Sequence, residues 1–79
     1  MKKYEKLLRK LSGKSRDLVI DAMRRLRAGD TAGLDIVKIG DNLFRTRAGN
    51  YRVFFFYEKG GKIEIDDIRK RDEKTYRDV

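Results

Sequence analysis

The stretch LFRTRAGNYRVFFFY, residues 43–57, decides the fold of this chain because it reads as two β-strands joined by a tight turn. Residues 43–47 and 51–58 are rich in aromatic and β-branched side chains, whereas Ala48-Gly49-Asn50 between them supplies turn residues. Three in-strand positions hold arginine: Arg45, Arg47 and Arg52. The arrangement raises the question of what a sheet does with these three cations.

Strand alternation predicts where the arginines point, because successive side chains face opposite sides of a sheet. Phe44, Val53 and Phe55 share one face, which we expect helices to cover. The other face then receives Leu43, Arg45, Arg47, Arg52, Phe54 and Phe56. Guanidinium groups match phosphate oxygens and aromatic rings can stack on bases, so this face favours a polyanion site. In the alternative interpretation, the arginines pair with Glu58, Glu64, Asp66 or Asp67, and the aromatic rings are buried under a terminus or a partner.

The N-terminal part predicts a helical hairpin. Apolar residues recur at helical spacing in the first helix: Tyr4, Leu7, Leu8 and Leu11. Residues 12–14 interrupt this pattern, and Ser15 is the expected N-cap of a second helix that ends at Gly29. The second apolar stripe consists of Leu18, Val19, Ala22, Met23 and Leu26.

The rest of the chain predicts further strands. An extended segment begins near Ile36, turns or bulges at residues 40–42, and continues into the opening stretch. Lys59-Gly60-Gly61 predicts a hairpin turn, after which residues 62–68 return as a strand whose register is disturbed at Asp66-Asp67. We therefore expect one α+β domain over residues 1–79, with the helical hairpin packed on one face of a small antiparallel sheet.

Composition restricts the chemistry. The 79 residues contain 21 Lys and Arg against 13 Asp and Glu, a net charge of +8, which attracts nucleic acid or an acidic protein. Residues 1–27 hold ten of the basic and three of the acidic side chains. The absence of Cys and His excludes disulfides, thiolate chemistry and the common zinc sites, so we expect no metal and no cofactor. No apolar run predicts a membrane span or a secretory signal, and the expected location is the cytoplasm.

The order of these motifs resembles the RelE/ParE superfamily of toxins from type II toxin-antitoxin systems. RTRAGNYRVFF carries the family's arginine, Gly-containing turn and Tyr-Arg-Val-aromatic run, and IEIDDIRKRDEKTY resembles its closing strand and tail. The resemblance covers nearly the whole chain. It implies a partner antitoxin and, for the RelE-like branch, an endoribonuclease (mRNA interferase) that enters the ribosome and inhibits translation. There a ribose 2′-OH attacks the adjacent phosphate of the mRNA.

The resemblance also implies roles for individual residues. Arg52 matches a phosphate-binding arginine, Arg71 the arginine that stabilises or protonates the leaving group, and Tyr76 a tyrosine that positions a base. With Arg45, these residues form the expected catalytic set. The expected RNA-binding residues are Arg47, Lys38, Phe54 and Lys70.

Departures from the family pattern keep other functions open. Leu43 falls near the position of a basic residue, so Lys38 or Arg45 would have to serve as the base. The family's first strand is missing, which predicts an exposed sheet edge that a partner or a second copy would cover as a homo-oligomer. Asp66 and Asp67 also add negative charge beside the site. The alternatives are a ParE-like inhibitor of DNA gyrase and an inert member that retains only antitoxin binding.

Overall fold

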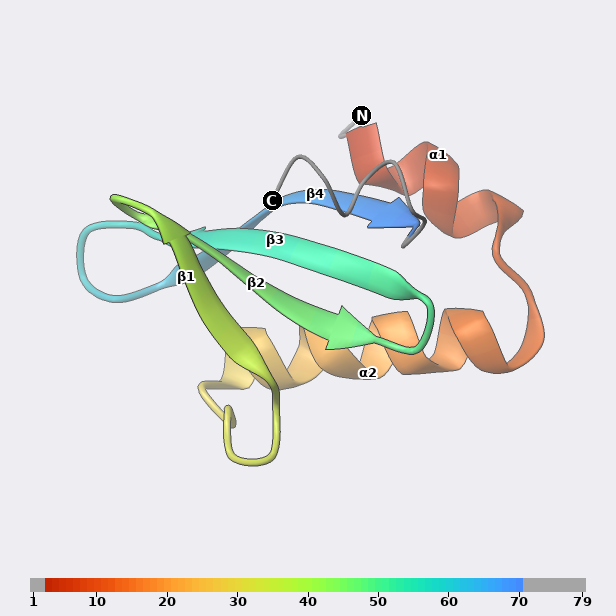
Figure 1. Cartoon of the computed structure of the whole chain (residues 1–79), viewed down its shortest axis with the longest axis horizontal. Helices are drawn as coiled ribbons and strands as arrows, with labels where there is room; N and C mark the ends of the chain where they lie inside the picture. Colours follow the sequence, from red (N-terminus) through yellow and green to blue (C-terminus); the bar gives the residue numbers. More distant parts are fainter. Residues whose placement is uncertain (1–2, 71–79) are drawn as a thin grey trace.

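The computed structural model describes residues 3–70, which form two α-helices followed by a four-stranded antiparallel sheet (Figure 1). The elements are α1 (Lys3–Lys10), α2 (Gly13–Ala28), β1 (Ile36–Gly40), β2 (Leu43–Ala48), β3 (Tyr51–Tyr57) and β4 (Ile63–Lys70). The strand order is β1-β2-β3-β4, so each strand pairs with the next one along the chain. The predicted α+β class is confirmed.

The bounds of α2 confirm one sequence prediction and correct another. Ser12, with an extended backbone, occupies the N-cap position, so the helix begins at Gly13 and Ser15 lies inside its first turn. The predicted N-cap at Ser15 is therefore wrong. Gly29 ends the helix as predicted, with a φ of 76° and an N–H that donates to the Leu26 carbonyl at 3.1 Å. The next N–H, from Asp30, donates to the Arg25 carbonyl at 2.9 Å, which completes a Schellman motif.

Both helices pack on the sheet, and α2 buries Val19, Ala22, Met23 and Leu26, whereas Leu18, predicted to belong to the same apolar stripe, is exposed. α1 packs on β4, whereas α2 packs on β2, β3 and β4 (Figure 1). Between the helices, Arg27 Nη2 donates to the Tyr4 hydroxyl at 3.4 Å. The core consists of Tyr4, Leu11, Val19, Ala22, Met23, Leu26, Ala48, Val53, Phe55, Ile63, Ile65 and Ile68.

The strand register separates the core face from a second face that holds the arginines. Arg45 lies opposite Phe54, Arg47 opposite Arg52, and Arg52 opposite Arg69. Because directly paired residues point to the same side, we define this second side as the arginine face. It contains Val37, Leu43, Arg45, Arg47, Arg52, Phe54, Phe56, Glu64, Asp67 and Arg69. The predicted division of β2 and β3 between two faces is confirmed.

Two irregularities shape the sheet. A bulge lies between Lys38 and Gly40 in β1, just before the turn at residues 41–42. In the second, Phe54 pairs with Asp67 while Phe55 pairs with Ile65, so Asp66 has no cross-strand partner. The predicted disturbance at Asp66-Asp67 is thus a β-bulge. Such bulges redirect neighbouring side chains.

Candidate nucleic-acid interface

Arginines from three neighbouring strands form a row across the arginine face. Arg47 on β2, Arg52 on β3 and Arg69 on β4 occupy adjacent register positions. Arg47 Nε lies 3.9 Å from Asp35 Oδ2, and Arg69 Nε lies 3.1 Å from Asp67 Oδ2. The alternative considered from the sequence paired Arg45, Arg47 and Arg52 with carboxylates of residues 58–67. Arg69, which pairs with Asp67, was not in that set, and Asp35, the loop residue beside Arg47, was not among the expected partners.

Arg52 is the most deeply buried charged residue among those described, with 1% of its surface exposed. The sequence predicts that it is presented to RNA phosphate, and its burial differs from that expectation. Alternation gives the side to which a strand residue points, but its exposure depends on what packs over it. A phosphate can reach this guanidinium only after its surroundings rearrange.

Arg45 occupies the next register row, between Val37 of β1 and Phe54 of β3. Its Nε and Nη1 atoms are shielded from solvent, and neither has a hydrogen-bond partner within residues 3–70. Unsatisfied donors of this kind cost about 1–3 kcal/mol, more when they are charged. An anion that accepted these two hydrogen bonds would remove this cost.

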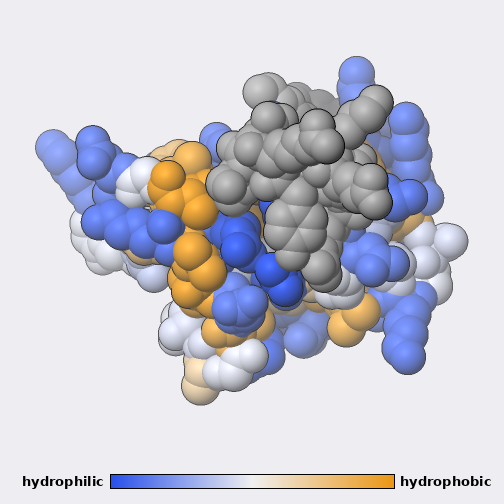
Figure 2. Space-filling view, viewed as in Figure 1, coloured by the Kyte–Doolittle hydropathy of each residue, from blue (hydrophilic) through white to orange (hydrophobic). Residues whose placement is uncertain are grey.

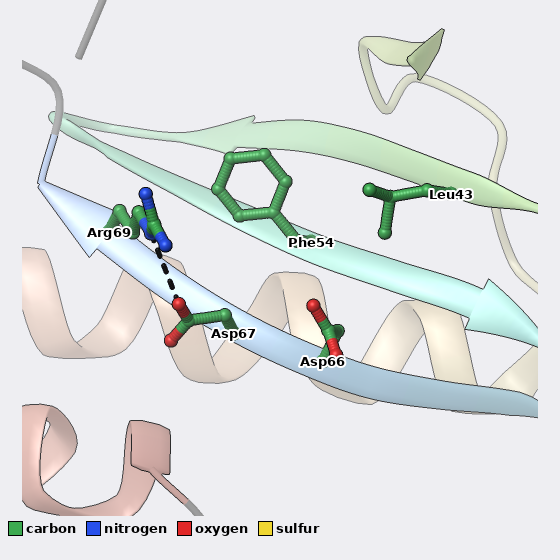
Figure 3. A pocket seen from close by; sticks show the side chains of 5 residues that line it. All are labelled: Leu43, Phe54, Asp66, Asp67 and Arg69. Carbon is green, nitrogen blue, oxygen red and sulfur yellow. Dashed lines mark hydrogen bonds and ion pairs between the residues drawn. The ribbon is translucent and has the colours of Figure 1, made fainter. Parts of the chain in front are cut away.

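The aromatic residues of this face are less open than the sequence predicts. Phe54 is 8% exposed, and Phe56 is half-buried. Phe54 instead lines a pocket of about 120 Å³ together with Leu43, Asp66, Asp67 and Arg69 (Figure 3). In the space-filling view, hydrophobic residues form a stripe over β1 and β2, directly beside hydrophilic residues (Figure 2).

The remaining predicted site residues are not brought together on this face. Lys38 pairs with Phe44, and Lys70 pairs with Tyr51, so both lysines belong to the side of the sheet that carries the core. Arg71 and Tyr76 lie outside the described residues. Sequence reasoning missed Arg69 as a member of the arginine row because the bulge at Asp66 resets the alternation of β4.

The described part of the chain holds no group of three or more His, Cys, Asp and Glu side chains placed to bind a metal ion. Neither α1 nor α2 is long and apolar enough to cross a membrane. Comparison of the chain with protein families, characterised proteins and solved structures finds no match.

Proposed function

We propose that this protein is the toxin of a type II toxin-antitoxin pair of the RelE/ParE kind, and that it cleaves mRNA on the ribosome. The observation that carries the proposal is Arg45, whose two shielded guanidinium nitrogens lack partners within residues 3–70, beside a row of three further arginines. The α+β architecture and the net charge of +8 are compatible with this function.

The proposed reaction is attack of a ribose 2′-OH on the adjacent phosphate, which leaves a cyclic phosphate and a 5′-OH. The pentacoordinate phosphorus builds up negative charge, and fixed cations stabilise such charge strongly in a site with little water. Arg45 supplies this stabilisation, and Arg47 binds a neighbouring phosphate. The resemblance adds Arg71 and Tyr76 to Arg45 and Arg47 as residues that contact the RNA. Arg52 can contact a phosphate only after the residues that bury it move.

A reconstituted translation reaction with a defined messenger tests the proposal. The wild type should produce new RNA ends in the ribosomal A-site codon. Arg45→Met and Arg71→Ala should each abolish them, whereas Arg16→Met on the exposed surface of α2 removes the same charge and should leave cleavage intact. Thermal unfolding of every variant separates loss of activity from loss of the fold.

Binding without chemistry is the second candidate function. It is favoured by the burial of Arg52, by the ion pair of Arg69 with Asp67, and by Leu43 on or near the position where RelE-like enzymes carry a basic residue. Intact messenger at high protein concentration would reject the nuclease. Inhibition of DNA gyrase in a supercoiling assay would then identify a ParE-like inhibitor, and no inhibition would leave an inert, antitoxin-binding member.

The proposed antitoxin has a suitable contact site on α2. Ile20, Met23, Arg24 and Arg27 line a groove of about 280 Å³ with an apolar floor and basic side chains. An amphipathic, acidic segment matches this combination, because its apolar side chains fill the groove and its carboxylates meet the arginines. Co-purification with the product of the adjacent gene, abolished by Arg24→Glu, tests this contact.

The toxin function implies a cytoplasmic protein that works on ribosomes. Among the described residues, β1 and β4 are the edge strands of the sheet. A second copy of the protein that pairs along one of these edges would form the proposed homo-oligomer. Light scattering at several protein concentrations measures this association.

A further inference from the structure

The pocket on the arginine face has the size and lining of a site for one flat ring. Its volume of about 120 Å³ lies below the range of sites for drug-sized ligands. Leu43 and Phe54 form its apolar part, and Asp66, Asp67 and Arg69 form its polar part (Figure 3). A peptide helix does not fit such a volume, whereas one nucleobase does.

The β-bulge explains why two consecutive carboxylates line the same pocket. In a regular strand, Asp66 and Asp67 would point to opposite faces. Here Phe54 pairs with Asp67 and Phe55 with Ile65, so Asp66 is the extra residue of β4 and lines the pocket with its neighbour.

The two carboxylates differ in their hydrogen bonds. Asp67 Oδ1 accepts the Ile68 N–H at 2.8 Å, and its Oδ2 accepts Arg69 Nε at 3.1 Å, so Asp67 is held in place and holds Arg69 (Figure 3). Asp66 is exposed, and its carboxylate makes no hydrogen bond or ion pair with any residue from 3 to 70. Asp66 is therefore the acceptor available to a ligand.

The chemistry of the lining selects among the bases. A carboxylate only accepts hydrogen bonds, and guanine presents two adjacent donors, N1–H and the N2 amino group, on its Watson–Crick edge. Adenine and cytosine place a ring acceptor beside their amino group, and uracil has one N–H between two carbonyls. A lysine or arginine from a partner protein also suits a carboxylate, but Arg45, Arg52 and Arg69 beside the pocket repel such a cation.

We propose that this pocket binds the base of one guanine nucleotide, with the ring against Phe54 and Leu43 and its two donors on Asp66. The nucleotide phosphate is drawn to the neighbouring arginines. This proposal rests on the proposed function, because the guanine would belong to a single-stranded messenger bound along the arginine row.

The test is a titration of the full-length protein with each of the four nucleoside 5′-monophosphates, followed by amide chemical shifts in NMR. GMP should shift the resonances of Phe54, Asp66 and Asp67 and should bind about tenfold more tightly than AMP, CMP or UMP. Asp66→Asn preserves the shape but presents an amide and should abolish this preference. Asp66→Ser, a second variant, should do the same.

Asp21→Asn is the matched control, because it removes one exposed carboxylate from α2 and should leave the preference unchanged. Equal affinity for all four nucleotides, no binding, or an undiminished guanine preference in both Asp66 variants would overturn the inference. Guanine preference without cleavage on the ribosome would reject the nuclease proposal and support the guanine site. Cleavage on the ribosome without guanine preference would support the nuclease proposal and reject the guanine site.

Discussion

Thr46 places a hydroxyl group in the core. The residue is 0% exposed, pairs with Val53, and its Oγ1 has no hydrogen-bond partner among residues 3–70. Thr46→Val preserves the side-chain shape and removes the unsatisfied hydroxyl, so we expect the free energy of unfolding to rise by about 1 kcal/mol. Urea denaturation measures the change. Thr46→Ser retains the hydroxyl, loses a methyl group and should lower stability by about 1 kcal/mol; a loss of stability in the valine variant would contradict the prediction.

Arg45 should show opposite effects on stability and on RNA binding. Arg45→Met removes the two shielded nitrogens that lack partners within residues 3–70 but preserves much of the apolar stem. Removing shielded donors that lack hydrogen-bond partners also removes the cost of their desolvation. We therefore expect unchanged or higher thermal stability, together with about tenfold weaker binding of a single-stranded RNA in fluorescence anisotropy. Equal losses of stability and affinity would instead identify Arg45 as a structural residue.

The turn between β2 and β3 depends on Gly49 and on its contact with α2. Gly49 has a φ of 63°, and a Cβ built on it would lie 2.9 Å from Leu18 Cδ1. We expect Gly49→Ala to lower the free energy of unfolding by about 1 kcal/mol, chiefly through the strain of a positive φ, with a small steric addition because the contacted atom is the end of an exposed, flexible side chain. Gly60→Ala, which has a φ of 88° but no atom within 4 Å of its Cβ, should cost slightly less, since it carries the backbone strain alone.

A double-mutant cycle separates the two contributions at this turn. Leu18→Ala removes the clashing methyl group, so adding it to Gly49→Ala should recover the steric part and leave the backbone strain. Strictly additive effects of the two changes, measured by chemical denaturation, would show that Leu18 does not restrict the turn.

The same elements show what alternation and turn residues can predict. They placed Arg45, Arg47 and Arg52 on one face and ended α2 at Gly29, because both features depend on local geometry. They did not predict the burial of Arg52, which depends on packing above the strand. In the sequence, the bulge at Asp66 appeared only as a break in the alternation of β4. The pocket with two carboxylates could not be predicted, because it depends on how β4 pairs with β3.

The charged surfaces lie on two sides of the molecule. The groove of Ile20, Met23, Arg24 and Arg27 belongs to α2, which packs on the core side of the sheet, whereas the arginine face is the other side. An antitoxin segment that fills the groove therefore leaves the arginine face uncovered. Complete neutralisation of the proposed toxin requires a second segment that reaches around the sheet or a rearrangement transmitted through it.

The salt dependence of RNA binding distinguishes a local site from a diffuse positive charge. Each phosphate neutralised on a single strand contributes about −0.7 to the slope of log K against log salt concentration. If Arg45, Arg47 and Arg52 bind three phosphates, the slope is about −2. Arg45→Met should make it shallower by about 0.7, whereas Arg16→Met on α2 should leave it unchanged. If the net charge of +8 acted as a whole, the two variants would reduce the slope equally, and the arginine face would lose its special role.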